Sequence, residues 1–388
     1  MTTDGLGVHE ASEAELTDWD RRAVEVPGGH VFQSQMWGEY RRRHGWRPRY
    51  LVFDDGFRLL SAERHWPVLG GAGAYLARGP VAAGEPVERT ADRLRAAADW
   101  LAAHGVDVVS SDAEIPAASG YPELLRARGF GPIEEVQPSR HRMTLALDPD
   151  PDRVFAGFTK SLRQTIRTAE HRNLRIVRYD ARWPRPAATP TPTPTLTREK
   201  HAGPSDAFER PPVEPVTADS VAPAFERLHD LLARTAVRRG FPIAPRAQLV
   251  DASSHAIADG LALHLEARSA EDELVASSLF YRHGERISYA LSADRVELRG
   301  RFPGVVQLVL WRAIQVAIAE GRPEFDLAGV DVLGARGRPR AGDEMHGLYV
   351  MKERFGGRWL ELSGNHEWVA RPARYAAGRL IARLARLR

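Results

Sequence analysis

A single lysine stands within an apolar stretch near the C-terminal end of the chain. The 388 residues include 54 Lys and Arg together, but only positions 160, 200 and 352 are lysines. Lys352 follows the apolar run Leu348–Met351 and precedes a Phe-Gly-Gly turn. A lysine ammonium is a compact charge whose pKa moves on burial, whereas an arginine is a planar fork that stays charged. Lys352 is therefore a candidate catalytic residue; the alternative is a helix lysine whose stem lies along a core face.

Two aspartates occupy matching places in the two halves of the chain. Asp326 ends a predicted strand in "EFDLAGV", and Asp112 follows a predicted strand in "VVSSDAEIP". Groups at strand ends often serve the active sites of α/β proteins. Asp326 is a second catalytic candidate, which orients an amine or holds Lys352, and Asp112 is a candidate for substrate binding. The alternative for both is a loop cap or an ion pair with an arginine.

The segment 155–172 has the periodicity of an amphipathic helix with a second, basic stripe. The apolar stripe comprises Phe155, Phe158, Leu162, Ile166 and Ala169, and the basic stripe comprises Lys160, Arg163, Arg167 and His171. The first three basic residues are candidates for binding phosphates of tRNA or of a substrate. The alternative is a solvated helix face.

Composition excludes several kinds of site. The chain has no cysteine, so a disulfide framework, a thiolate metal site and a cysteine nucleophile are excluded. Its 14 histidines show no metal-ligand spacing, so no metal is expected. The polar, acidic N-terminus is not a signal peptide, and no apolar run reaches the roughly 18 residues that span a bilayer. We therefore expect a cytoplasmic protein.

Arginine clusters, at a net charge of only +3, favour anionic partners such as phosphates, RNA or a membrane face. The Pro/Thr-rich segment 182–216 is expected to be a disordered loop inside a domain. Residues 366–388 are expected to form a basic helix packed on the first subdomain, with peripheral contact to the inner face of a membrane as the alternative.

The remaining chain repeats one plan of hairpin, helix, strand, helix and strand. The first unit is predicted over 1–147 and the second over 148–365, with the second hairpin turning at His283-Gly284. This order predicts an α/β (α+β) protein with two subdomains and mixed sheets, and it resembles the acyl-CoA N-acyltransferase-type (GNAT) fold, twice over. The GNAT pyrophosphate-loop pattern occurs once, in "RARGFG" at 126–131, but there it ends a helix instead of opening one.

Four stretches together resemble the Fem family of peptidoglycan aminoacyltransferases, the FemA/FemB/FemX group. They are "FQSQMWGEYRRRHGW" at 32–46, "FTKSLRQTIRTAEHRNLRIV" at 158–177, "LRGRFPGVVQLVLWRAIQVAIAEGRPEFDLAGV" at 298–330 and "GLYVMKERFGGRWLELSG" at 347–364. All four occur in family order over most of the chain. The resemblance implies two GNAT-like subdomains and transfer of an amino acid from aminoacyl-tRNA to an amine on the stem peptide of a peptidoglycan precursor.

The resemblance also implies roles for individual residues. The functional lysine of the family falls at Lys352, although Met351 stands where the family commonly has Phe. Arg299 matches the substrate-phosphate arginine of the family, with Arg301 as a rival for the same role. Tyr349 belongs to the motif around Lys352. In the N-terminal motif, Trp37 and Arg41 match substrate-binding positions, with arginine in place of the usual lysine.

The chemistry of this reaction fits the residues that are present. Attack of an amine on an aminoacyl ester creates an oxyanion, which Lys352 could stabilise, and the activated ester needs no enzyme nucleophile. Aminoacyl-tRNA then acts as co-substrate, no other cofactor is required, and the acceptor is a nucleotide-linked or lipid-linked muropeptide; DNA is not an expected partner. The alternatives are a CoA-dependent N-acyltransferase acting on a small amine, a tRNA-dependent peptide ligase of natural-product biosynthesis, and a non-catalytic RNA- or lipid-binding module.

Overall fold

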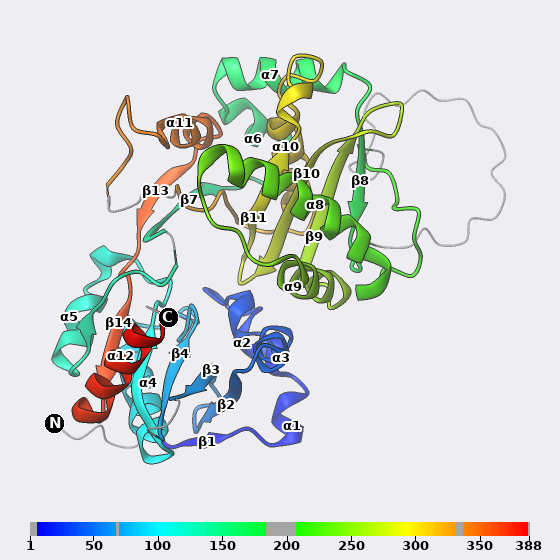
Figure 1. Ribbon diagram of the computed structural model, residues 1–388. Helices are drawn as coiled ribbons and strands as arrows, with labels where there is room; N and C mark the ends of the chain where they lie inside the picture. Colours follow the sequence, from blue (N-terminus) through cyan, green and yellow to red (C-terminus); the bar gives the residue numbers. More distant parts are fainter. Residues whose placement is uncertain (1–5, 67–69, 138, 184–206, 331–336, 387–388) are drawn as a thin grey trace.

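Two seven-stranded mixed sheets, each with helices packed against it, form the two subdomains of the protein (Figure 1). The computed structural model describes residues 6–66, 70–137, 139–183, 207–330 and 337–386. The prediction of an α/β (α+β) fold with two mixed sheets is confirmed. Within the described ranges, no helix combines the length and the apolar character that crossing a bilayer requires.

The first sheet combines strands from the N-terminal third of the chain with one strand from near its C-terminal end. Its order is β1-β2-β3-β4-β5-β14-β6, and only β4 and β5 run parallel. Helix α4 packs on this sheet through Ala91, Leu94 and Leu101, whose spacing places them on one helix face. The strands are β1 (Val8–Glu10), β2 (Arg47–Phe53), β3 (Arg58–His65), β4 (Ala72–Leu76), β5 (Val106–Ser111), β14 (His366–Val369) and β6 (Gly131–Pro132).

The second sheet has the order β13-β7-β12-β11-β10-β9-β8, and only β11 and β12 run parallel. This parallel pair places Ser288 of β11 opposite Asp326 of β12. The strands are β13 (Arg358–Glu361), β7 (His141–Ala146), β12 (Glu324–Asp326), β11 (Arg286–Asp294), β10 (Leu274–His283), β9 (Ala262–Arg268) and β8 (Arg175–Tyr179).

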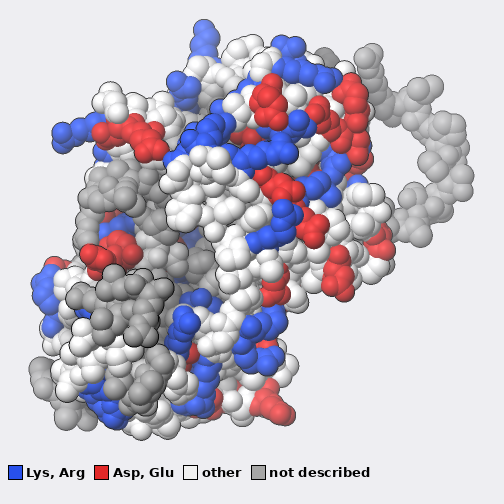
Figure 2. All heavy atoms as spheres, viewed as in Figure 1, with Lys and Arg blue, Asp and Glu red and all other residues white. Residues whose placement is uncertain are grey.

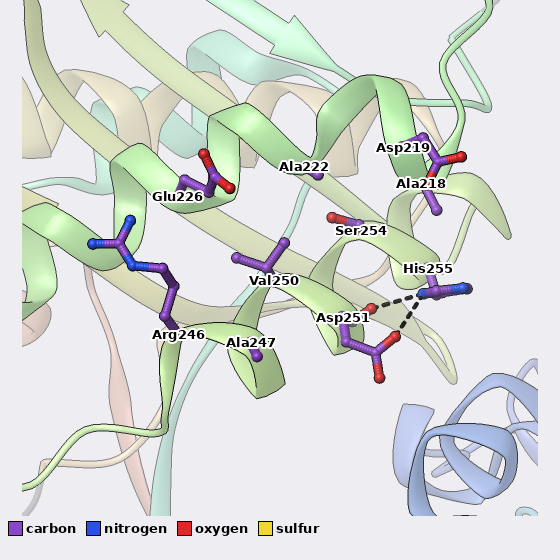
Figure 3. A pocket seen from close by; sticks show the side chains of 10 residues that line it. All are labelled: Ala218, Asp219, Ala222, Glu226, Arg246, Ala247, Val250, Asp251, Ser254 and His255. Carbon is purple, nitrogen blue, oxygen red and sulfur yellow. Dashed lines mark hydrogen bonds and ion pairs between the residues drawn. The ribbon is translucent and has the colours of Figure 1, made fainter. Parts of the chain in front are cut away.

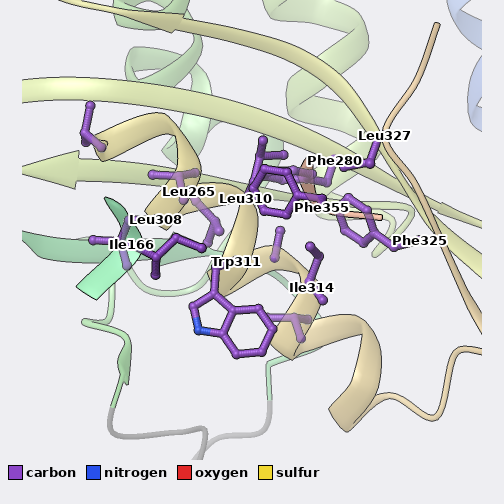
Figure 4. Packing of buried hydrophobic residues seen from close by; sticks show 14 of the residues in the cluster. Ile166, Leu265, Phe280, Leu308, Leu310, Trp311, Ile314, Phe325, Leu327 and Phe355 are labelled. Carbon is purple, nitrogen blue, oxygen red and sulfur yellow. The ribbon is translucent and has the colours of Figure 1, made fainter. Parts of the chain in front are cut away.

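Helices cover both faces of the second sheet. Consecutive side chains of a strand point to opposite faces, so Phe280 packs with α6, α7 and α10, whereas Leu279 packs with α8 and α9. Figure 4 shows the α10 side, where Trp311 and Ile314 share one core cluster with Phe280, Phe325 and Phe355 of other elements. These helices are α6 (Pro151–Gly157), α7 (Lys160–Glu170), α8 (Ala218–Arg239), α9 (Arg246–Ala258), α10 (Val305–Ala319) and α11 (His346–Arg354).

The two subdomains share a hydrophobic cluster. Trp19, Val31 and Met36 of the first subdomain pack in one cluster with Phe225 and Leu279 of the second. The apolar surface buried there holds the subdomains together, since each would otherwise expose it to water. The first subdomain contributes α1 (Glu13–Leu16), α2 (Trp19–Ala23), α3 (Gln35–Arg43), α4 (Val87–Ala103), α5 (Tyr121–Ala127), α12 (Pro372–Arg386) and the short helices η1 (Val31–Gln33) and η2 (Ala117–Ser119), and η4 (Val296–Leu298) follows β11.

The sheets exchange strands, so the predicted boundary at 147 is wrong for β7; residues 366–369 lie with the first subdomain, where the prediction placed them, but as strand β14 and not as a helix. Strand β7 lies before residue 147 but pairs with β12 and β13 in the second sheet. Residues 362–365 then connect β13 directly to β14, which inserts between β5 and β6 of the first sheet. The chain therefore crosses between the subdomains twice, and pairing across long sequence separations decides strand membership.

The segment 155–172 is two helices and not one. Phe158 is extended at φ −70° and ψ 153°, and Thr159 starts α7 by accepting a hydrogen bond from the Leu162 N–H at 3.4 Å. The predicted apolar stripe is buried on both pieces, because Phe158, Leu162 and Ile166 all enter the core of the second subdomain.

The predicted loop 182–216 lies largely outside the described residues, which resume at 207. Its described end is ordered, contrary to the prediction of disorder. Glu209 exchanges backbone hydrogen bonds with β8, donating to Ile176 O at 2.8 Å and accepting from Arg178 N at 3.0 Å. At the other end of the chain, α12 lies by the first sheet (Figure 1), where Arg374 is 3.5 Å from Asp107 of β5.

Truncation of Phe280 tests the core of the second subdomain. Phe280 is fully buried between α10 and Phe325, so Phe280→Ala should lower the free energy of unfolding by about 3–5 kcal/mol. Urea unfolding followed by circular dichroism measures the change. Val237→Ala is the control, because that side chain is 88% exposed and its loss should change the unfolding midpoint little. Equal midpoints for the two variants would contradict this packing.

Candidate active site

Lys352 is buried and holds the loop that follows β12. The residue is 2% exposed, and its Nζ donates hydrogen bonds to Gly329 O at 2.5 Å and to Ala328 O at 3.3 Å. The same Nζ lies 5.6 Å from the centre of the Tyr289 ring. A lysine along a core face would carry its amine out to water, so the burial of the amine itself rules out that alternative.

Asp326 holds the same loop from its other side. Its Oδ1 accepts a hydrogen bond from Ala328 N at 2.7 Å, and its Oδ2 accepts one from Ser288 Oγ at 3.4 Å. Ala328 has φ +61°, which is unusual for a residue with a Cβ and which such local contacts must maintain. The two catalytic candidates are therefore linked through one strained peptide segment. Asp326 does act as a loop cap, which is the alternative to a catalytic role given for it from the sequence.

A group of charged and histidine side chains surrounds Asp326 and continues across the boundary between the subdomains. Arg142 Nη1 and Arg286 Nε lie 3.8 and 3.9 Å from Asp326 Oδ2. Arg286 also donates a hydrogen bond to Glu114 of the first subdomain. We call this group the interface cluster; its members are His30, Arg78, Asp112, Glu114, Arg142, His283, Arg286, Glu324 and Asp326.

The interface cluster reaches the other predicted aspartate, Asp112. Asp112 Oδ1 accepts a hydrogen bond from Arg78 N at 2.6 Å, and Oδ2 lies 3.5 Å from Arg78 Nη1. Arg78 Nε is in turn 3.7 Å from Glu114. Burial raises the pKa of Asp112, although the charge of Arg78 opposes this shift. Asp112 is thus part of an ion-pair network, which is the alternative to a substrate-binding role given for it from the sequence. The same network connects Asp112 to Asp326.

Electrostatics keep the carboxylate of Glu114 charged and the histidines neutral. Arg286 and the other cations hold the pKa of Glu114 well below its usual value against the opposing effect of burial. Burial lowers the pKa of His30 to about 3 and that of His283 well below its usual value. Desolvation disfavours each charged form, so the arginines and carboxylates persist as ions only because they are paired.

Arg41 and Trp37 form an aromatic and cationic face on α3, which packs against β2 and β3. The Arg41 guanidinium lies 4.3 Å from the Trp46 ring centre and 5.4 Å from that of Trp37, which stacks on Phe32. Arg41 Nε and Trp37 Nε1 are buried and have no hydrogen-bond partner among the described residues. Arg41 and Trp37 therefore offer two buried N–H groups that no described residue accepts from.

The remaining candidates lie outside the interface cluster. Arg299 forms a two-pronged ion pair with Asp294, and Arg301 donates to Glu271 at 2.9 Å, so both arginines already have carboxylate partners. Tyr349 is nearer to Lys352, on the same helix, and its hydroxyl donates to Glu353 at 2.7 Å.

The basic stripe of α7 is not a uniform row of free cations. Arg163 Nη1 donates to the backbone oxygens of Ala156 and Phe158, so it closes the end of α6. Arg167 lies 5.5 Å from the Phe155 ring centre. Lys160 is exposed at the first turn of α7. Figure 2 shows Lys and Arg side chains over the upper part of the second subdomain, mixed there with acidic ones.

Sequence analysis missed Arg78, Glu114, Arg142 and Arg286. One signal was available for Arg286: the strand "RISYAL" begins with an arginine on the same face as Ser288, where a charge needs a buried partner. The hairpin turn is also displaced by one residue, because His283 pairs with Arg286 and leaves Gly284 and Glu285 as the turn.

The best-defined cavities of the described residues are separate from this site. One of about 390 Å³ lies between α8 and α9 (Figure 3), where Glu226 and Arg246 flank Val250 and Asp251 contacts His255. Neither cavity is lined by a member of the interface cluster. Within the described ranges, no three His, Asp or Glu side chains gather in a way that could hold a metal ion.

Replacement of His30 tests the buried neutral histidines. The ordinary histidine pKa of 6.5 applies to the unfolded chain, whereas the folded pKa is about 3. As the pH falls below 6.5 only the unfolded chain gains a proton, so each such histidine lowers the free energy of unfolding by about 1.4 kcal/mol per pH unit. His30→Asn keeps a side-chain acceptor for the Phe32 N–H and should flatten this dependence.

Urea midpoints measured from pH 7 to about pH 5 give this slope. The exposed His104 provides the control, because His104→Asn should keep the wild-type slope. A His30→Asn slope as steep as that of the wild type would show that His30 takes up its proton in the folded protein.

Comparison with known proteins supports the predicted fold. Residues 198–344 match the family model of the acetyltransferase (GNAT) domain. The crystal structure of FemX aligns with a TM-score of 0.71 at 15% identity, covering 96% of this chain and 99% of FemX. L-PGS from Bacillus licheniformis aligns with a TM-score of 0.50 at 12% identity, covering 98% of each chain. No curated protein sequence matches the chain. The chain thus has the two-subdomain GNAT-like fold of FemX, as the Fem resemblance implies, and carries an acetyltransferase-type domain.

Proposed function

We propose that the protein is an aminoacyltransferase that moves an amino acid from aminoacyl-tRNA to an amine on the stem peptide of a peptidoglycan precursor. One observation carries this proposal: a buried lysine amine and a buried aspartate hold the same loop, next to a charged network that crosses to the first subdomain. The Fem-like motifs and the shared fold with FemX support the choice of donor and acceptor. Interpeptide bridge formation in the cell wall is the role that follows.

The proposed chemistry is an ester-to-amide exchange. The amine nitrogen attacks the ester carbonyl carbon, and the C–N bond forms as the carbonyl oxygen becomes an oxyanion. The C–O bond to the tRNA ribose then breaks, the ribose oxygen takes up a proton, and the amine nitrogen loses one. The Lys352 ammonium stabilises the oxyanion, and its burial makes that interaction stronger than it would be in water.

In this proposal, carboxylates of the interface cluster orient the attacking amine or accept its proton. The attacking nitrogen must be neutral, so a proton acceptor or an orienting carboxylate near it favours the reaction. Asp326 adjoins the Lys352 loop, and burial raises the pKa of Asp112, which favours proton uptake by the Asp112 carboxylate. Arg41 and Trp37 supply a cation and a ring for a phosphorylated carrier on the acceptor. Arg299 would need to exchange Asp294 for such a phosphate.

A CoA-dependent N-acyltransferase is the second candidate, because the matched domain is of the acetyltransferase type. The only sequence with the pyrophosphate-loop pattern lies in a structural context that argues against this candidate. Residues 126–131 leave the C-terminal end of α5 and enter β6, with Gly129 at φ +86°. Anions bind at helix N-termini, where N–H groups are unpaired, and this segment offers the opposite end.

A tRNA-dependent ligase for small natural products would use the same reaction, and a non-catalytic RNA- or lipid-binding module would not need Lys352. We propose a cytoplasmic location, because the donor and the nucleotide-linked or lipid-linked precursors are reached from that side. Arginine-rich surfaces, including the exposed Lys160 region of α7, are the proposed contacts for tRNA phosphates.

Replacement of Lys352 tests the proposed function. Lys352→Met should lower the rate of transfer by roughly 10²–10³-fold, as expected when an oxyanion-stabilising group is lost. Lys352→Arg should restore little activity, because a planar guanidinium does not fit the position of an ammonium. The assay follows label from charged total tRNA into nucleotide-linked and lipid-linked muropeptides, and ribonuclease should abolish transfer.

The matched control is Arg354→Met, which removes an exposed cation two residues further along α11 and should retain wild-type activity. Label transfer from acetyl-CoA, insensitive to ribonuclease, would favour the second candidate. An active Lys352→Met enzyme would refute the proposed mechanism.

A further inference from the structure

We propose that Glu114 and Arg286 are positioning residues: Glu114, from the opposite subdomain, sets the Lys352 loop by holding Arg286. This inference deepens the proposed function and rests on it only where catalytic rates are concerned. Arg286 is 4% exposed and is the first residue of β11, in the second sheet. Glu114 follows β5 of the first sheet, and its side chain is 11% exposed. Their hydrogen bond therefore joins the two subdomains at a place that is nearly inaccessible to solvent.

A continuous series of contacts runs from this pair to the lysine amine. Arg286 lies 3.9 Å from Asp326, which caps Ala328 N at 2.7 Å, and the oxygens of Ala328 and Gly329 accept from Lys352. Each contact is short enough to transmit a displacement of its neighbour. The amine that would face the reacting ester is thereby placed by a carboxylate of the other subdomain.

The same series extends toward the proposed acceptor side. Arg78 lies between Asp112 and Glu114, 3.5 Å from the first and 3.7 Å from the second. Arg78 has φ +54°, a strained conformation for a residue with a side chain. A ligand that displaces Arg78 from Asp112 would therefore also disturb Glu114 and, through it, Arg286.

The turn before Arg286 is fitted tightly into the first subdomain. Gly284 N donates to Val24 O at 2.5 Å, and His283 Nδ1 contacts Gly29 O at 3.0 Å. A Cβ on Gly284 would lie 3.1 Å from the backbone of Gly29, so a larger residue would not fit without a shift. This anchoring leaves Arg286 little freedom to follow a second-subdomain motion away from Glu114.

The test uses the accessibility of lysines, which needs no substrate. Lys160 and Lys352 fall on different peptides of a protease digest. Mass spectrometry can therefore follow the acetylation of each lysine by a water-soluble, amine-reactive reagent. In the wild type, buried Lys352 should react at least about 10-fold more slowly than exposed Lys160, because reaction requires local opening. Glu114→Gln should bring the two rates within about 3-fold of each other.

Catalytic rates provide the second measurement. Glu114→Gln should lower kcat by roughly 10-fold or more and leave KM within about 2-fold, because the loop is misplaced while substrate contacts persist. A role in folding alone would not lower kcat while leaving KM unchanged. The control Glu63→Gln removes a carboxylate from an equally buried ion pair, with Arg49, in the first sheet and should change neither the Lys352 rate nor kcat.

A double variant separates positioning from stability. Glu114→Gln alone leaves Arg286 buried without its carboxylate, so the single variant is expected to be the less stable one. Glu114→Gln with Arg286→Gln removes both charges and should regain thermal stability, yet Lys352 should stay reactive and kcat low. Wild-type lysine protection in the folded double variant would overturn the inference. Altered protection in a protein that transfers no amino acid would refute the proposed function and leave the positioning role intact.

Discussion

Burial of opposite charges at the boundary between the subdomains is the constraint on which the rest of the structure depends. Three arginines and four carboxylates of the interface cluster come from both sheets, and several of them are nearly inaccessible to water. A buried ion without a partner costs several kcal/mol, so either subdomain alone would carry unpaired charges. The shared hydrophobic cluster brings the subdomains together, and the ion pairs specify how they must meet.

This arrangement explains how the proposed catalytic groups are held in a protein built from two similar halves. Lys352 belongs to α11 and Asp326 to β12, and both act on one short loop of the second subdomain. The loop adjoins the edge where the first subdomain contributes Glu114 and Arg78. Groups held by several independent contacts lose little conformational freedom in a reaction, which is the basis of electrostatic preorganisation.

The strand exchange also links the two subdomains covalently, because the chain passes between them twice. Strand β14 lies in the first sheet only four residues after β13 leaves the second, and β7 makes the reverse crossing earlier in the chain. Separation of the subdomains would have to break the interface cluster, and both crossings would still limit how far the subdomains could move apart. The arrangement favours a rigid frame in which adjustments are confined to side chains and loops.

The sequence by itself determined the local elements and the class of fold, and it singled out Lys352 as a candidate. Its periodicity predicted most helices and hairpins, because apolar spacing records which face of an element is buried. The scarcity of lysine drew attention to position 352 as a catalytic candidate, and the structure shows that this side chain is buried.

Only the tertiary structure decided which charges meet. Arg286 and Glu114 are 172 positions apart, and no local pattern along the chain indicates that these two residues meet. Strand membership was decided in the same way: β7 and β14 pair with partners far along the chain, so local patterns could not assign them. Pairing energy depends on distance in space, which periodicity along the chain does not record.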